Sequence, residues 1–228
     1  MINENDILKL VDWVLLNSTA TSSAGLYNGK AGISLSLFDV ARVLNDSYIS
    51  DWASELFKEV LLTKDDDVSF EYGLSGIGYS LLYLIEYKYI EADFEDIFEE
   101  LLNLIIKQIK LWESKKDRLS FFNHMSVVFF LDYSQKCTNN NQYDFYIDMF
   151  LNVSDYFLNL QLHELSNYSN IDFTTHVLDS LRKFIKIIAF CSTQCYQGKS
   201  LELYSNLYED GRFVSYFSLG HHLATVAD

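Results

Sequence analysis

Two glycine-containing segments of similar sequence lie 44 residues apart in this chain of 228 residues, and they constrain the fold more than any other feature. The first is GLYNGKAGISLSLF, residues 25–38, and the second is FEYGLSGIGYSLL, residues 70–82. In this register, the G-x-x-G pair that begins at Gly29 aligns with the pair that begins at Gly73. Six of the nine glycines of the chain fall in these two segments. A repeat of this length predicts a supersecondary unit that is used more than once.

Helical periodicity follows each glycine pair. Apolar side chains recur at three- and four-residue intervals after both pairs, which is typical of an α-helix with one apolar stripe. The residues of these stripes are Ile33, Leu37, Val40, Ala41 and Leu44 in the first copy and Ile77, Leu81, Leu84 and Ile85 in the second. Further apolar side chains, such as Phe38 and Leu82, lie on the opposite side of each helix. We therefore expect both helices to be buried nearly all round.

The segments between these helices have the pattern of amphipathic helices. We expect Ser50 or Asp51 to cap one of them, with Trp52 on its inward side, and Asp93 to cap the next. Buried and amphipathic helices thus alternate, as they do in a double-layered α/α barrel or in a stack of helical hairpins. The sequence therefore predicts an all-α protein whose repeated helical hairpins form a partial or shrunken (α/α) barrel, or toroid.

A degenerate third copy of the repeat follows at residues 121–131, FFNHMSVVFFL. Asn123 and Ser126 occupy its glycine positions, 50 residues after the second pair, and another worn copy is centred on Gly220. Other segments with helical periodicity are residues 5–17, 143–162 and 173–190. No linker is long enough to separate two domains, so we expect a single domain over residues 1–228.

The charge and the distribution of apolar residues exclude several classes of partner. With 17 basic and 32 acidic residues, the formal net charge is −15, which disfavours nucleic acid because binding to phosphates requires an excess of Lys and Arg. We expect no membrane span, because no stretch approaches the roughly 18 consecutive apolar residues that one needs. The first ten residues lack the pattern of a signal peptide. Three cysteines argue against a disulfide framework, so we expect a cytoplasmic protein with reduced thiols.

The glycine pairs have two physical uses. Without a Cβ atom, the chain can turn tightly into a helix and approach a neighbouring segment closely. The N–H groups of the first helical turn can also face an anion. We interpret the pairs as close packing at a repeated corner, because they match neither nucleotide-binding motif. No strand precedes them, as a Rossmann fingerprint requires, and Lys30 is followed by Ala31 where a Walker A motif has Ser or Thr.

The segment LYNGKAGISLSLF, together with YGLSGIGYSLLYLIEYKYIEAD, resembles the first two repeats of lanthionine synthetase C-like proteins, and the similarity covers residues 22–108. In that family, N-G-x-A-G-I and G-L-x-G-I-G mark corners that lead into the inner helices of an (α/α) toroid. The resemblance implies a role in peptide modification. The family's enzymes add cysteine thiols to dehydrated Ser or Thr of a precursor peptide, and a zinc ion held by two Cys and one His activates the thiol.

The family's zinc-binding motifs are not found in this chain. The nearest match to its W-C-Y-G-type motif is QCYQG, which contains Cys195, but Gln197 intrudes and the Trp is missing. Gly220-His221-His222 is distant from the family's Cys-His-Gly motif, with His where Cys is expected. A full toroid of the family also needs more than 228 residues. We therefore carry over no zinc site and predict no catalytic, cofactor-binding or metal-binding residue.

An alternative metal site involves the C-terminal part of the chain. Cys191 and Cys195 are spaced i, i+4, and His176, His221 or His222 would complete a zinc site with them. We favour the simpler interpretation that Cys191 packs in a helix core and Cys195 lies in a loop. Other residues to which we assign no function are Cys137, His163, the acidic run Asp65, Asp66 and Asp67, and His124, which we expect to be satisfied by local hydrogen bonds.

Three functions are consistent with these patterns. The first, which we favour, is an accessory subunit of peptide modification that lacks the zinc site and binds a peptide or a partner modification enzyme. The second is a zinc-dependent peptide cyclase with a rearranged site built from Cys191, Cys195 and His221 or His222. The third is a helical-repeat interaction module that is unrelated to peptide maturation. Because the chain is short, pairing into a homo-oligomer is one way in which the ring would close.

Overall fold

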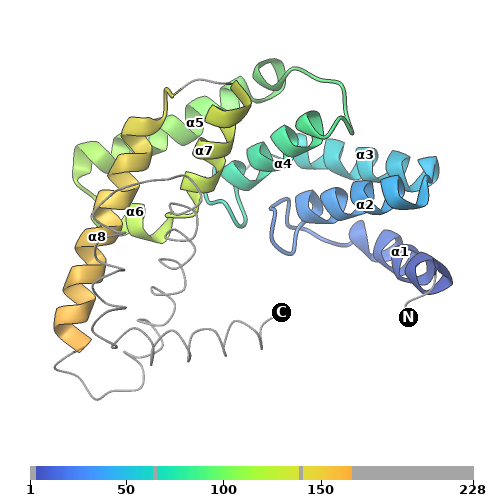
Figure 1. The fold of residues 1–228 in the computed structure, drawn as a ribbon, viewed down its shortest axis with the longest axis horizontal. Coiled ribbons are helices and arrows are strands. Elements are labelled where there is room, and N and C mark those ends of the chain that lie inside the picture. The colour runs from blue at the N-terminus through green and yellow to red at the C-terminus, as the bar shows by residue number, and fades with distance from the viewer. Residues whose placement is uncertain (1–3, 64–65, 139–140, 166–228) are drawn as a thin grey trace. The chain divides into compact units, whose positions relative to one another are not determined.

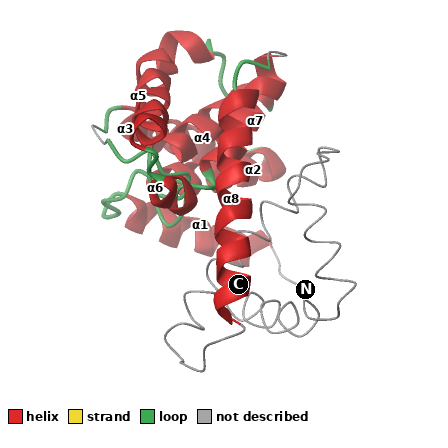
Figure 2. Ribbon diagram, turned by 90° about the vertical axis from the view of Figure 1, so that its left-hand side faces the viewer, coloured by secondary structure: helices red, strands yellow, loops and turns green. Residues whose placement is uncertain are grey.

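The computed structural model describes residues 4–63, 66–138 and 141–165, and this part of the chain contains eight α-helices and no strand (Figures 1 and 2). The helices are α1 (Glu4–Ser18), α2 (Lys30–Leu44), α3 (Ser47–Leu61), α4 (Leu74–Glu86), α5 (Phe94–Lys115), α6 (Arg118–Asn123), α7 (Val127–Thr138) and α8 (Asp144–Leu165). The predicted all-α class is confirmed. The helix expected at residues 173–190 and the copy centred on Gly220 lie outside the described residues.

The described residues group into two compact units. The first contains α1 to α5 and α7, and the second contains α6 and α8, which pack against each other. In the second unit, the ring of Phe121 lies edge-on to that of Phe150 at 4.9 Å, and both side chains are buried. A single domain over residues 1–228, and the closure of the hairpins into a barrel, stay predictions.

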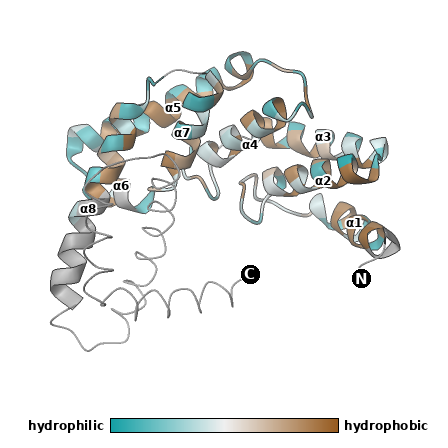
Figure 3. Ribbon diagram, in the orientation of Figure 1, coloured by the Kyte–Doolittle hydropathy of each residue, from teal (hydrophilic) through white to brown (hydrophobic). Residues whose placement is uncertain are grey.

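Within the first unit, the helices pair as the repeat predicts. The hairpin of α2 and α3 has the most extensive helix–helix contact, α4 packs against α5, and α4 also contacts α2 and α7. α4 is buried along most of its length, including both Ile77 and Leu82. α5 is amphipathic, and it carries alternating brown and teal bands in Figure 3. α2 is less enclosed than expected, because Val43 on its last turn is 79% exposed.

The cap of α3 differs from the sequence prediction. Neither Ser50 nor Asp51 caps the helix; Asp46 does, and its Oδ1 accepts hydrogen bonds from the N–H groups of Tyr48 at 2.9 Å and Ile49 at 3.4 Å. The physical reason is that α2 ends in a residue with left-handed backbone, Asn45 at φ 53°, so the chain reverses within two residues. The predicted cap of α5 is confirmed, since Asp93 accepts from the N–H groups of two first-turn residues.

One inward position predicted for α3 is wrong, because Trp52 lies only at the margin of the buried stripe. Its side chain is 38% exposed rather than facing inward. The other inward positions of α3 hold, since Leu56, Phe57 and Val60 are all buried. Trp52 lies one turn before Leu56 at the margin of the stripe, so the neighbouring helix covers its large ring only in part.

The two corners have the same hydrogen bonds, shifted by 44 residues. Lys30 N–H donates to the carbonyl of Ser23 at 2.9 Å, and the N–H of the aligned residue Leu74 donates to the carbonyl of Asp67 at 2.7 Å. The corners are also joined to each other, because Tyr27 N–H donates to the carbonyl of Glu71 at 2.7 Å. The repeat seen in the sequence is therefore a repeat of backbone geometry.

Close backbone approach explains the second glycine of each pair. A Cβ atom on Gly32 would lie 2.1 Å from the carbonyl oxygen of Leu26, and one on Gly76 would lie 2.0 Å from that of Phe70. Real Cβ atoms do not approach an oxygen this closely, so only glycine fits. The left-handed residue of the first corner is instead Asn28, at φ 54°.

The third copy keeps the apolar positions and changes the corner. Val127 and Leu131 of α7 are fully buried. The aligned residues of α4, Ile77 and Leu81, are also buried. However, α6 ends at Asn123 and α7 begins only at Val127, three residues later than the repeat register predicts. At the aligned position of the second corner, a Cβ atom on Gly73 would lie 2.1 Å from the carbonyl oxygen of Asp67. A side chain at this position therefore prevents the same tight corner.

Candidate functional site

Tyrosines gather on one side of α4 and on its neighbours in the first unit. Tyr79, Tyr83 and Tyr87 follow one another at intervals of four residues, which places them on the same side of the helix and the turn after it. All three are partly exposed, while most other α4 side chains are buried. We call this surface the tyrosine face and define it by Tyr79, Tyr83, Glu86, Tyr87 and Tyr89 around α4, Asp39 and Arg42 of α2, and Tyr133 of α7.

On the α2 side of the tyrosine face, donors converge on one carboxylate. Asp39 accepts hydrogen bonds from the hydroxyl of Tyr83 at 3.3 Å and from the hydroxyl of Tyr89, and it forms an ion pair with Arg42 at 3.3 Å. The ring of Tyr83 stacks on that of Tyr87, with ring centroids 4.4 Å apart. The carboxylate therefore holds two phenol rings and one guanidinium in place.

On the α7 side, the hydroxyl of Tyr133 donates to Oε2 of Glu86, and its ring packs against that of Tyr79 at 4.8 Å. Phe70 continues the cluster, since it contacts Tyr79 at 5.3 Å and Phe129 at 5.7 Å. Aromatic side chains from the second corner, α4 and α7 thus form one contiguous cluster.

The phenol groups of the tyrosine face and the nearby Cys137 thiol have raised pKa values, which favours hydrogen bonding over nucleophilic chemistry. Burial raises the pKa of Tyr79, and burial together with the neighbouring carboxylates raises the pKa values of Tyr83, Tyr89 and Tyr133. Burial, and then Glu86, raises the pKa of the Cys137 thiol. At neutral pH the phenols therefore stay protonated and donate hydrogen bonds, and the thiol is not activated.

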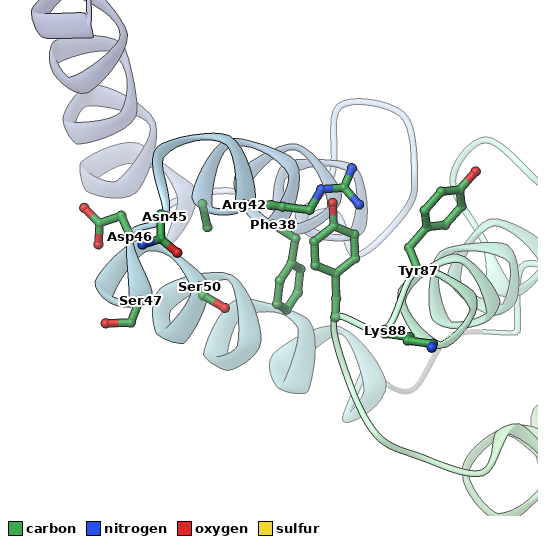
Figure 4. Close-up of a pocket in the computed structure, with 10 residues that line it drawn as sticks. Phe38, Arg42, Asn45, Asp46, Ser47, Ser50, Tyr87 and Lys88 are labelled. Atoms are coloured by element: carbon green, nitrogen blue, oxygen red, sulfur yellow. The ribbon is translucent and has the colours of Figure 1, made fainter.

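A pocket of about 540 Å³ opens beside the α2 end of the tyrosine face (Figure 4). It lies between the end of α2, the start of α3 and the turn after α4, where Lys88 has a left-handed backbone at φ 58°. Figure 4 shows that Arg42 lies along α2 with its guanidinium directed toward Tyr87, and that Phe38 lies below it. The pocket thus combines aromatic walls with two cationic side chains.

The residues singled out in the sequence take structural roles where the structure describes them. Nδ1 of His124 lies 2.8 Å from the carbonyl oxygen of Ser120, which confirms the expected local hydrogen bond. Asp67 accepts from the N–H and the hydroxyl of Ser69, at 2.8 and 2.9 Å, and so shapes the second corner. Lys30, which a phosphate-binding loop would leave free, forms an ion pair with Glu59 at 2.5 Å. Cys137 is exposed near the end of α7.

The remaining candidates are not brought together by the described part of the chain. Cys191, Cys195, His176, His221 and His222 lie outside it, as does Asp65, and His163 falls in α8. Among residues 4–63, 66–138 and 141–165, no three His, Cys, Asp or Glu side chains are placed to hold a metal ion. The described residues therefore do not fit a zinc ion, and we derive no chemical step through one. No helix in the same ranges is long and apolar enough to cross a membrane.

A comparison with known families accounts for the repeated corners. The family model for lanthionine synthetase C-like protein matches residues 6–126, which is more than half of the chain. The chain therefore belongs to the lanthionine synthetase C-like family. The match extends the resemblance seen in the sequence, which covered residues 22–108, to include α1 and the third corner. No curated protein and no solved structure matches the chain.

Sequence reasoning missed the tyrosine face, although the repeat register contained a sign of it. Asp39, Tyr83 and Tyr133 occupy one position of the three copies, at offsets of 44 and 50 residues. Arg42 and Glu86 likewise occupy one position of the first two copies. Extending the alignment beyond the glycine corners would have grouped these residues.

Proposed function

We propose that this chain is an accessory, non-catalytic member of its family that binds a peptide on the tyrosine face during peptide modification. The observation that carries the proposal is the set of ordered, partly exposed tyrosines on α4 and α7, which are fixed by Asp39 and Glu86. Tyrosine suits peptide binding because it offers a large apolar ring and a hydroxyl group at a low cost in conformational entropy. Family membership connects this surface to peptide chemistry.

The sequence supports the non-catalytic part of the proposal. The family's two zinc-binding motifs are not found in this chain, and the segments nearest to them, around Cys195 and around His221-His222, lack ligands that the motifs require. Elemental mass spectrometry of the natively purified protein tests this part directly. We expect less than stoichiometric zinc. One zinc per chain, lost in Cys195→Ala, would replace the proposal with the rearranged cyclase.

Selection of peptides tests the binding part. A phage library of random peptides is panned against the full chain, and enriched peptides are synthesised and titrated. We expect Tyr133→Ala and Tyr79→Ala to weaken binding several-fold, because each removes one ring from the aromatic cluster. Tyr48→Ala is the matched control, since Tyr48 is 62% exposed on α3 and lies outside the face.

Two results would contradict the binding part. Equal weakening by the control variant would show that the tyrosine face is not the site. Failure to enrich any peptide, with the variants and the parent folded by circular dichroism, would favour the helical-repeat interaction module.

A further inference from the structure

The pocket beside the tyrosine face has a charge that differs from that of the chain as a whole. The chain has a net charge of −15, yet the charged side chains that line this pocket are Arg42, Lys88 and Asp46. Asp46 is committed to capping α3 through two backbone N–H groups. With two cations and one acid, the lining residues carry a net charge of +1 in a chain that is otherwise strongly acidic, which favours an anion with a single charge.

Arg42 is held in an orientation that suits a planar anion. Its guanidinium lies over the ring of Tyr89 at 4.8 Å and near that of Tyr87 at 5.9 Å. Within the described residues it makes one hydrogen bond, from Nη2 to Asp39. A guanidinium carries five N–H donors, so most of them remain available to a ligand. Figure 4 shows the side chain running along α2, which agrees with its ion pair to Asp39 one turn earlier on the same helix.

Lys88 adds a second positive charge from the turn after α4. Its backbone is fixed by a hydrogen bond from its N–H to the carbonyl of Ile85 at 3.0 Å. Its side chain forms no salt bridge with any described residue. Lys88 is therefore a lining residue without an ion pair among the described residues, while Asn45 and Ser50 contribute neutral polar groups to the lining.

The nearby acids limit which anion fits. Asp39 touches Arg42, and Asp46 lines the pocket, so a dianion such as phosphate would be repelled more strongly than a monoanion. A carboxylate carries one charge and matches the fork of N–H groups on a guanidinium. The rings of Phe38, Tyr87 and Tyr89 provide an apolar wall for a side chain attached to it.

We propose that this pocket binds a carboxylate group of the peptide, next to an aromatic or apolar side chain. The inference rests on the proposed peptide-binding function and deepens it, because it names what the peptide must carry. The carboxylate is either the C-terminus of the peptide or the side chain of an Asp or Glu residue. Both sources present the same chemistry to Arg42.

Three small probes distinguish the possibilities in titrations of the ¹⁵N-labelled full chain followed by NMR. Acetyl-Ala-Phe has a terminal carboxylate, acetyl-Asp-Phe-amide has a side-chain carboxylate, and acetyl-Asn-Phe-amide is the neutral match. We expect saturable shifts at the backbone amides of Asn45, Lys88 and Tyr89 with at least one acidic probe. We expect the neutral probe to bind about tenfold more weakly, because it lacks the charge-assisted hydrogen bonds. The acidic probe with the lower Kd identifies the source.

Variants connect the binding to Arg42. We expect Arg42→Gln to weaken the binding of the acidic probes about tenfold. Arg42→Lys retains the positive charge and an aliphatic side chain, so we expect it to weaken their binding less. Arg118→Gln is the matched control, because Arg118 also lies over a tyrosine ring, that of Tyr156 at 4.2 Å, but does not line this pocket. Equal binding of the neutral probe, unchanged binding in both Arg42 variants, or tighter binding of inorganic phosphate would overturn the inference.

The outcome for this pocket is separable from the outcome for the tyrosine face. One outcome is that the binding of selected peptides depends on Tyr79 and Tyr133 while the binding of the acidic probes is unchanged in the Arg42 variants. In that case the carboxylate inference fails and the proposed function stands. If no peptide is selected but the acidic probes still bind through Arg42, the pocket stands as a carboxylate site and the proposed function fails.

Discussion

The hydroxyl of Tyr83 donates a hydrogen bond to the carboxylate of Asp39 at 3.3 Å, and these two residues occupy the same position of consecutive repeats, 44 residues apart. Tyr133 occupies this position in the third copy, and its hydroxyl reaches Glu86 of the second. At one repeat position, each later copy thus donates a hydrogen bond to the copy before it. This relationship links α2, α4 and α7 through polar contacts as well as through the buried core.

Removal of the Tyr83 hydroxyl tests how much this link stabilises the fold. We expect Tyr83→Phe to lower the free energy of unfolding by about 1 kcal/mol, because Asp39 loses one donor while the ring stack with Tyr87 remains. Guanidinium-induced unfolding measures the change. Tyr48→Phe, on the exposed surface of α3, should change the free energy by much less, and an equal loss in both variants would argue against the link.

Alanine in place of Gly76 should destabilise the protein, although alanine ordinarily stabilises a helix relative to glycine by about 1 kcal/mol. The new Cβ atom would lie 2.0 Å from the carbonyl oxygen of Phe70, so the second corner must open. We expect a loss of about 3 kcal/mol or more, or failure to fold. Thermal unfolding checks this, with the exposed residue Ser36→Ala as the control on α2. A stabilised Gly76→Ala variant would contradict the described corner.

Two buried serines, Ser34 on α2 and Ser80 on α4, should respond oppositely to alanine. Both are fully buried, but Ser80 Oγ donates to the carbonyl of Gly76 at 2.8 Å, whereas Ser34 Oγ has no hydrogen-bond partner among the described residues. We expect Ser34→Ala to be neutral or to stabilise by about 1 kcal/mol, since it removes an unsatisfied polar atom, and Ser80→Ala to destabilise. Chemical unfolding of the pair measures both. A larger loss in Ser34→Ala than in Ser80→Ala would count against this arrangement.

The corrected cap of α3 makes a direct comparison possible. Asp46→Ala should cost about 1 kcal/mol of unfolding free energy, because two first-turn N–H groups lose their acceptor. Asp51→Ala, at the position that sequence alone indicated, should be close to neutral because Asp51 is exposed within the helix. Unfolding curves of the two variants measure both losses of stability. A larger loss in Asp51→Ala than in Asp46→Ala would favour the cap predicted from the sequence.

Alkaline pH should destabilise the protein through the tyrosine face. The pKa values of Tyr83, Tyr89 and Tyr133 are raised in the folded state above the ordinary value of 10. The folded state then retains protons that the unfolded chain loses, so the stabilisation is complete below about pH 10 and declines as the pH rises further. Unfolding free energies at pH 8 and above pH 10 measure the slope. Tyr133→Phe should flatten it, and an unchanged slope would exclude Tyr133 as a contributor.

Local sequence determined the elements of this protein. The periodicity after each glycine pair predicted α2 and α4, the position of Asp93 before an amphipathic pattern predicted the cap of α5, and the 44-residue offset predicted two equivalent corners. These features depend on side-chain spacing and on the absence of a Cβ atom, which a sequence states directly. The cap predicted for α3 was wrong, because Asp46 can cap this helix only when the chain reverses immediately after Asn45.

Only the tertiary structure decided which surface carries the candidate site. Asp39 and Tyr83 are remote in the chain, and they meet because the buried faces of α2 and α4 pack together and turn these two side chains toward each other. Arg42 likewise lines a pocket only because the turn that follows α4 brings Tyr87 and Tyr89 within reach of its guanidinium. The sequence by itself specified the repeated corners through glycine and periodicity, whereas contacts between helices depend on distances that no single segment encodes.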